Sequence, residues 1–286
     1  MNSTRASLPT DLSMALAAAH DALDGFASTV HYYAVAGSTN DIAAEFARAG
    51  AADGTVVVAD AQTAGRGRNG RSWFSPPGAG LYVSIILRPT AVDAFATGAP
   101  PWARLITLAA GVALATGLRT ATGLPVDVKW PNDIVVADSQ APTAAGRRWR
   151  KIAGILAEGQ TFDGVLQHVV LGYGINLQAA AYPPDIADRA SSLEAELGRG
   201  VERAPVLVQT LAALRREYEA LLSGDAAGVL DRWQALAPSS HGTRVSWTQA
   251  GTAHEGTTAG IDHEGALVVI EGPLAWHVTA GEVVWV

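Results

Sequence analysis

The 286-residue chain contains no cysteine, and charged residues make up only 16% of it. Without cysteine it cannot form a disulfide, a thiolate metal site, an iron–sulfur cluster or a cysteine nucleophile, which excludes zinc fingers and thiol enzymes. Soluble proteins carry roughly 25% charged residues. Because 49% of this chain is hydrophobic, it has ample material for a buried core, and intrinsic disorder is not expected.

Excess positive charge and long apolar runs are also lacking. The formal net charge is -7, whereas proteins that gain affinity by releasing phosphate counterions present a basic face, so we expect no nucleic-acid partner. No uninterrupted apolar run approaches the ~18 residues of a membrane span. Acidic residues interrupt the N-terminal segment at short intervals, which is not typical of a signal peptide. These absences predict a cytoplasmic protein without a membrane partner.

Hydrophobic periodicity divides the chain into three parts. Residues 1–29 contain a weak helix, residues 30–237 alternate strands with helices, and residues 240–286 alternate short strands with glycine turns. Predicted strands of the middle part cover residues 30–35, 55–59, 81–87, 126–130, 152–157 and 168–171, and predicted helices begin at Ser38 and cover 101–118 and 205 to about 236. We therefore expect an α+β fold in which a mixed β-sheet with flanking helices is followed by a small β-barrel.

A segment rich in glycine and arginine follows the second predicted strand. Its glycines match the GxGxxG pattern of dinucleotide-binding folds, which requires a helix directly after the loop. Here Trp73–Pro77 and then a strand follow instead, so this interpretation is rejected. Glycine lets a backbone approach a ligand closely, and guanidinium groups donate paired hydrogen bonds to phosphate or carboxylate. The arginines Arg66, Arg68 and Arg71 therefore suit a polyphosphate or an acyl phosphate, with a solvated basic turn as the alternative.

Six segments, read in order, closely resemble the motifs of the biotin protein ligases, which attach biotin to a lysine of carrier proteins. They are Ser38-Thr39-Asn40, Gln62, Gly65–Arg71 with Trp73-Phe74-Ser75, Lys129–Asp133, Lys151–Leu156 and Gly172–Leu177. The resemblance spans Ser38 to Leu177, and residues 260–283 are similar to the SH3-like domain that follows in this family. It implies a mixed sheet of the kind shared with class II aminoacyl-tRNA synthetases.

The resemblance also implies a reaction. Biotin and ATP would form biotinyl-5'-AMP, from which biotin passes to a lysine in the biotin carboxyl carrier domain of an acyl-CoA carboxylase. Mg²⁺ is expected, because it offsets triphosphate charge and binds mainly through the phosphates. Bifunctional members carry an N-terminal winged-helix domain before the first motif. Only 37 residues precede Ser38, so we expect a ligase without repressor activity.

Residue roles follow from the same resemblance. The expected catalytic residues are Lys151, Arg66 and Arg68. The expected biotin-binding residues are Ser38, Thr39, Asn40, Gln62, Gly65, Arg66, Gly67, Arg68, Lys151 and Gly154. The expected nucleotide-binding residues are Arg68, Arg71, Trp73, Asn132, Lys151 and Asn176. Asp133 is expected to face a metal ion or to orient its neighbours.

Each role has a purely structural alternative. Ser38 could simply cap a helix, Asn132 and Asp133 could form a turn, and Lys151 could be a charge at a strand edge. Gln62, Trp73 and Asn176 could be ordinary loop, core and structural residues. Lys129 lies on the opposite strand face from its apolar neighbours, which predicts a solvated or salt-bridged side chain.

Two other functions compete with biotin ligation. Lipoate or octanoate ligases share the implied fold and the adenylation step, and a regulatory protein could bind the same ligands without catalysis. The arginine-rich loop together with Lys129–Asp133 favours biotin. A pure sensor would need neither Lys151 at the reacting phosphate nor a closing loop.

Overall fold

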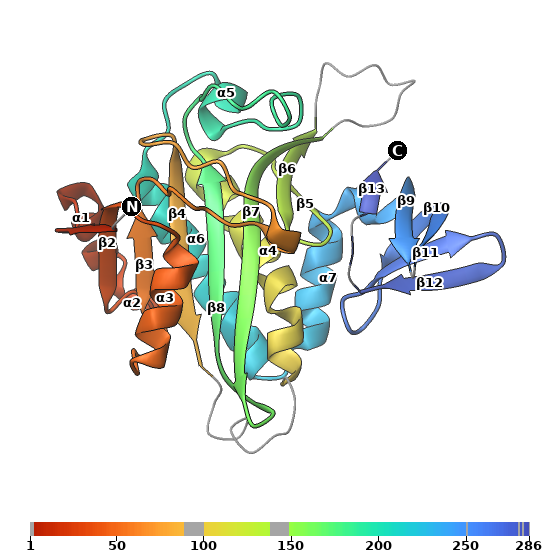
Figure 1. Ribbon diagram of the computed structural model, residues 1–286, viewed down its shortest axis with the longest axis horizontal. Coiled ribbons are helices and arrows are strands. Elements are labelled where there is room, and N and C mark those ends of the chain that lie inside the picture. Colours follow the sequence, from red (N-terminus) through yellow and green to blue (C-terminus); the bar gives the residue numbers. More distant parts are fainter. Residues whose placement is uncertain are drawn as a thin grey trace.

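A computed structural model describes residues 3–88, 100–137, 149–249, 251–279, 281 and 283–285. It contains an eight-stranded sheet in the order β1-β2-β3-β4-β8-β7-β6-β5 and a five-stranded sheet in the order β12-β11-β10-β9-β13 (Figure 1). The first comprises β1 (Thr4–Ala6), β2 (Val30–Val35), β3 (Val56–Ala59), β4 (Gly80–Leu87), β5 (Asp127–Lys129), β6 (Asp133–Ala137), β7 (Trp149–Phe162) and β8 (Val165–Asn176). Its β2 and β3 are parallel and its other neighbours antiparallel, so the predicted mixed sheet is confirmed.

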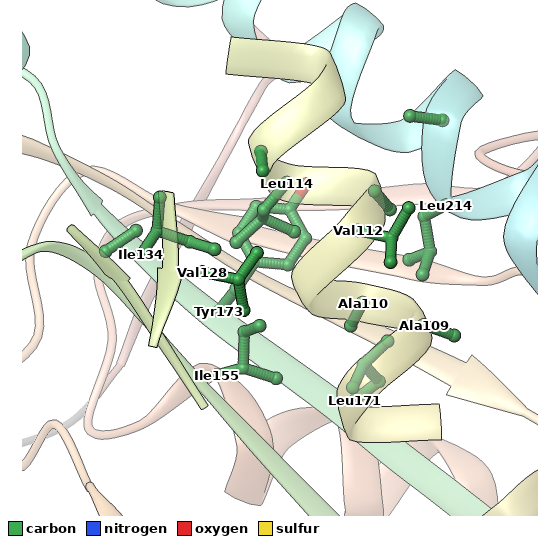
Figure 2. Packing of buried hydrophobic residues seen from close by; sticks show 14 of the residues in the cluster. Ala109, Ala110, Val112, Leu114, Val128, Ile134, Ile155, Leu171, Tyr173 and Leu214 are labelled. Atoms are coloured by element: carbon green, nitrogen blue, oxygen red, sulfur yellow. The ribbon is translucent and has the colours of Figure 1, made fainter. Parts of the chain in front are cut away.

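Helices cover the large sheet on both faces. They are α1 (Thr10–Ala18), α2 (His20–Leu23), α3 (Thr39–Arg48), α4 (Pro101–Thr122), α5 (Leu193–Leu197), α6 (Arg203–Leu222) and α7 (Ala226–Leu236). Side chains alternate along β3, so Val56 and Val58 enter a large core while Val57 and Ala59 enter a smaller core beneath α3. In the large core, Ala110 and Leu114 of α4 face the sheet, and α6 packs behind them (Figure 2).

Helix α4 is the longest helix and the centre of the large core. Pro100 and Pro101 precede and open it, and Gly123 ends it in the left-handed conformation with φ 78°, so proline and glycine stand at their favoured ends. A methyl group on Gly117 would lie 2.7 Å from the Cα of Thr210, so glycine lets α4 and α6 approach closely. Within the described part of the chain, α4 alone is long and apolar enough to span a membrane, and here most of it is buried inside the protein.

The second sheet comprises β9 (His241–Gln249), β10 (Thr252–Ile261), β11 (Leu267–Glu271), β12 (Leu274–Val278) and β13 (Val283–Trp285). The sequence predicts a barrel here, but β12 and β13 stand at opposite edges of an open sheet, and no pair closes it within the described residues. A short 3₁₀ turn, Pro238–Ser240, precedes β9 at the predicted boundary. The division into three parts remains a prediction.

Four elements are absent from the sequence-based interpretation: β1, β6, α5 and β12. The first of them pairs with β2, so the N-terminal segment extends the large sheet. The predicted N-terminal helix is two short helices, α1 and α2. Strand β6 was missed because Trp130–Asn132 form a tight turn and Asp133 opens the returning strand of a hairpin, with Lys129 opposite Asp133.

Candidate active site

A cavity of about 340 Å³ lies on the sheet face that α3 only partly covers. Every sequence-predicted site residue except Gly65 lines it. The lining also includes Ser72, Phe74, Lys129, Trp130, Val135, Trp149, Leu156, Gly172, Gly174, Tyr182, Arg189 and Trp285. The cavity therefore crosses the sheet from α3, over β8 and β7, to β5 and to β13 of the second sheet.

Glycines make the floor of this cavity. Leu171, Tyr173 and Ile175 of β8 point into the large core, so Gly172 and Gly174 between them face the cavity. A methyl group on Gly174 would lie 2.4 Å from Nε1 of Trp73. The Trp73 ring thus lies against the strand backbone. The alternation of glycine with large residues in this segment is a sequence signal for a hollow that our sequence analysis did not use.

The α3 end of the cavity is polar and almost fully buried. Oε1 of Gln62 accepts hydrogen bonds from the backbone N–H of Thr39 at 2.9 Å and from its hydroxyl at 3.2 Å. The Ser84 hydroxyl lies 2.9 Å from Oγ1 of Thr39 and donates to Oδ1 of Asn40 at 2.6 Å. Because buried polar groups need hydrogen-bond partners, this end suits a small ligand with donors and acceptors of its own. The sequence analysis missed Ser84, which lies on β4.

Ser38 stands at the N-cap position of α3, as the capping alternative predicts, but its side chain makes no capping hydrogen bond. Its side chain is 3% exposed and lines the cavity. The N-cap position of Ser38 was therefore predicted correctly, but the expected capping hydrogen bond is not formed. Gly65, which does not line the cavity, lies where a methyl group would meet Ser75 and Trp73 at 2.7 Å, so it permits the close fold of the loop.

Arg66 is held by two carboxylates. Its guanidinium donates to both carboxylate oxygens of Glu158 on β7, at 2.7 and 2.6 Å, and lies 2.8 Å from Oδ1 of Asp41 on α3. Oε2 of Glu158 also accepts from Nδ2 of Asn40 at 2.7 Å. Glu158 thus ties the beginning of the arginine-rich loop to α3, and the sequence analysis did not identify it.

Arg68 reaches the middle of the cavity, where its contacts are sparser. Nη1 donates to Oδ1 of Asn132 at 3.5 Å, and Nδ2 of Asn132 donates to the carbonyl of Ile155 at 2.7 Å. Burial lowers the pKa of Arg68, and the Asp133 carboxylate partly offsets that effect. Among the described residues, its guanidinium makes no pair of carboxylate hydrogen bonds of the kind that engages Arg66.

Lys151 lies within β7 rather than in front of it. Its Nζ is 2.6 Å from Oδ1 of Asp133 and 4.9 Å from the centre of the Trp73 ring. Its backbone N–H donates to the carbonyl of Arg189 at 2.7 Å. The alternative of a charge at an open strand edge does not fit, because Lys151 pairs with Val135 of β6 on one side and forms a bridge with Ala190 on the other. The ammonium is therefore fixed at the centre of the cavity.

Asn176 and Tyr182 fix the wall of the cavity near Arg189. Nδ2 of Asn176 donates to the carbonyl of Ser191 at 2.8 Å, and the Tyr182 hydroxyl donates to the same oxygen at 3.0 Å. The hydrogen bond to Ser191 supports a structural role for Asn176, and the residue also lines the cavity.

For Lys129 the sequence predicts a solvated or salt-bridged side chain, and this remains a prediction. The side chain is on the opposite face from Val128 and Trp130, as predicted, but that face looks into the cavity and the residue is half-buried. Burial lowers the pKa of Lys129 to about 8; Asp133 works against this shift, and Lys151 adds to it. Its Nζ lies 5.3 Å from the centre of the Trp285 ring.

Comparison with known proteins places these residues in a family. The sequence profile of the Biotin/lipoate A/B protein ligase family matches residues 32–176. The bifunctional ligase/repressor BirA of Bacillus subtilis is 35% identical over 208 residues, which are 72% of this chain and 58% of that protein. The biotin–[acetyl-CoA-carboxylase] ligase of Paracoccus denitrificans is 30% identical over 185 residues, covering 63% of this chain and 70% of its relative.

The biotin protein ligase of Aquifex aeolicus, solved in complex with biotin and ATP, has the same fold. Its TM-score is 0.72 at 23% identity, over 90% of this chain and 98% of that one. The chain spans between half and three-fifths of the BirA proteins that it matches. The family profile, covering half of the chain, and the shared fold agree: this chain belongs to the biotin/lipoate A/B protein ligase family.

Proposed function

We propose that this protein is an ATP-dependent ligase that converts biotin into biotinyl-5'-AMP and transfers the biotin to a lysine of the biotin carboxyl carrier domain of an acyl-CoA carboxylase. One observation carries the proposal: a single cavity joins a buried polar end at α3 to the Lys151–Asp133 ion pair under an arginine-rich loop. Names of relatives support the substrate, since several are called biotin ligases.

Biotin binds at the α3 end in this proposal. Thr39, Asn40 and Gln62, together with Ser38, surround its ureido ring, whose N–H and C=O groups need partners there. The tail passes beside Gly154, which lets Trp73 and Lys151 pack closely here: a methyl group at this position would lie 2.8 Å from the Trp73 ring and 3.0 Å from Nζ of Lys151. The carboxylate then reaches Lys151.

In the first step a biotin carboxylate oxygen attacks the α-phosphorus of ATP. The new oxygen–phosphorus bond forms as the bond to the pyrophosphate oxygen breaks, and pyrophosphate leaves. Lys151 stabilises the negative charge that builds up on the phosphate oxygens, and Arg68 holds the adenylate under the loop once it has formed. In the second step the carrier amine attacks the acyl carbon, and AMP leaves. Arg66 supports the loop through Glu158.

Mg²⁺ is proposed as the companion of the triphosphate. Among the residues that line the cavity, Asp133 has the sole carboxylate, and the described residues hold no cluster of three His, Asp or Glu side chains. This donor set fits an ion bound mainly through phosphates, with Asp133 as its protein ligand. Such an ion neutralises charge on the leaving pyrophosphate.

Three further proposals concern organisation. Residues 30–237 would form the catalytic domain, after an N-terminal segment of residues 1–29, and residues 240–286 an SH3-like domain; five short strands with positive-φ glycines between them support this division. We also propose a cytoplasmic location, where carboxylase carriers and ATP are available.

The test is exchange of radiolabelled pyrophosphate into ATP, measured with biotin, with lipoate and with neither acid. Exchange with biotin alone, followed by labelling of a purified carrier domain, is the expected result. Exchange with lipoate alone would show that biotin is not the substrate acid. If no acid supports exchange, the sensor alternative gains support.

Gly172→Ala should raise the KM for biotin about 10- to 100-fold, because small displacements of positioning groups cost up to roughly 10²-fold in rate. The added methyl group would lie 2.0 Å from Oδ1 of Asn40, which Ser84 and Glu158 hold in place. Exchange kinetics at varied biotin measure this effect. Gly159→Ala is the control, since its methyl group would meet only one Leu166 methyl, at 3.3 Å. Equal KM values for both variants would contradict the assigned biotin end.

A further inference from the structure

The second sheet closes one end of the cavity. Val283 and Trp285 of β13 line it together with Lys129 of β5, which is the outer strand of the large sheet. Nearby, Nε1 of Trp130 donates to the carbonyl of Gly265 at 3.0 Å and ties the two sheets together. The polar pocket at α3 lies at the opposite end of the cavity, and Lys151 of β7 lies between the two ends.

Positive charge dominates this end. Lys129 and Arg189 line the cavity on this side of Lys151, and the single carboxylate of the lining, Asp133, already pairs with Lys151. A half-buried ammonium group loses hydration, as the lowered pKa of Lys129 reflects, and regains stability when a phosphate binds beside it. The arrangement fits a polyanion longer than a single phosphate.

The use of lysine in this chain is informative. Lysine and arginine together number 20, of which two are lysine, and both lysines line the cavity. Arginine serves at every other basic position. A compact ammonium therefore occurs in this chain only at the candidate site, where it can lie against phosphate oxygens without the planar fork of arginine.

We propose that Lys129 is a further catalytic residue, which binds the β- and γ-phosphates of ATP, and that Trp285 is a positioning residue that holds its ammonium group in the cavity. The proposal rests on the ligase function above. The Trp285 ring lies 5.3 Å from Nζ of Lys129, within the range of a cation–π interaction. Since pyrophosphate leaves after the first step, both residues act in adenylation and neither acts in transfer.

The test compares Trp285→Ala, Trp285→Phe and Lys129→Met. Trp285→Ala should raise the KM for ATP in pyrophosphate exchange about threefold to tenfold, which is the range expected for one partly buried cation–π pair. The phenylalanine variant should recover most of that loss. Lys129→Met should raise this KM about 10- to 100-fold, because it removes a charged partner of the phosphates. The KM for biotin should stay unchanged in all three.

Two measurements separate a positioning role from a structural one. Transfer of biotin from added biotinyl-AMP to the carrier should proceed at the normal rate in every variant. Adding Trp285→Ala to Lys129→Met should raise the KM for ATP no further, because Trp285 acts through Lys129. Val284→Ala is the matched control: Val284 lies on the same strand but is 52% exposed and does not line the cavity.

An unchanged KM for ATP in Lys129→Met would overturn the proposal, even if Trp285→Ala failed to fold. Slow transfer from added biotinyl-AMP would also overturn it, since that step involves no pyrophosphate. By contrast, absence of biotin-dependent exchange in the unaltered protein would refute the ligase function itself. The two failures are therefore distinguishable.

Discussion

Lys151→Ala should slow the formation of biotinyl-AMP by about two to three orders of magnitude, because losing one preorganised charge at a transition state typically costs about 3 to 4 kcal/mol. The structure strengthens this expectation. The ammonium lines the cavity 2.6 Å from Asp133, and the Lys151 backbone is paired with β6 on one side and with the segment around Ala190 on the other. Quenched-flow measurement of the adenylate, with biotin and ATP saturating, is the direct test.

Lys151→Arg should recover little of the lost rate. Its planar guanidinium needs more width than an ammonium, and the Lys151 side chain already lies so close to Gly154 that a methyl group there would be 3.0 Å from Nζ. If the alanine variant forms the adenylate at a near-normal rate, Lys151 has a structural role and is not catalytic. Thermal unfolding of both variants checks that the fold survives.

Arg68→Gly should still form biotinyl-AMP but release it at least about tenfold faster, since a hydrogen bond to a charged group contributes roughly 1.5 to 3 kcal/mol. Arg68 is the arginine of the loop that reaches towards Asn132 in mid-cavity, whereas Arg66 is engaged by Glu158. Released adenylate should label lysines of a bystander such as serum albumin, which mass spectrometry detects.

Asn69→Gly is the matched control for this prediction. Asn69 already adopts φ 56°, a conformation that suits glycine, so this variant adds backbone freedom and keeps the Arg68 guanidinium. It should label bystanders less than Arg68→Gly. Equal labelling would show that retention depends on the stiffness of the loop. If Arg68→Gly still synthesises biotinyl-AMP but bystander labelling does not rise, Arg68 does not retain the adenylate in the site.

Local signals predicted much of the fold. Apolar segments located the middle of the two long strands β7 and β8, and α4 begins at Pro101 as predicted but runs past the predicted end at Leu118 to Thr122. Strand β6 escaped because a turn residue and a strand residue, Asn132 and Asp133, look alike in sequence. The barrel expectation is not confirmed, because short strands and glycine turns predict hairpins but not whether the outer strands meet, and β12 and β13 do not pair within the described residues.

The motifs located most of the cavity, but the supporting contacts depend on the sheet order. Glu158 contacts Asn40 and Arg66, which are 118 and 92 residues away, only because α3, the loop and β7 meet over one sheet face. Ser84 reaches Asn40 for the same reason. For Lys129, strand alternation gave the correct face but could not show that this face looks into the cavity beside β13 of the second sheet.

The confinement of both lysines to the cavity also affects the chemical fate of the protein itself. A mixed anhydride acylates primary amines, and arginine is not acylated under such conditions because its guanidinium stays protonated. Lys151 forms an ion pair with Asp133 inside the cavity. Every basic side chain outside the cavity is arginine or histidine. Apart from its terminal amine, the chain therefore presents no primary amine outside the cavity, and an adenylate that escaped in the proposed reaction would find no lysine on this protein's surface.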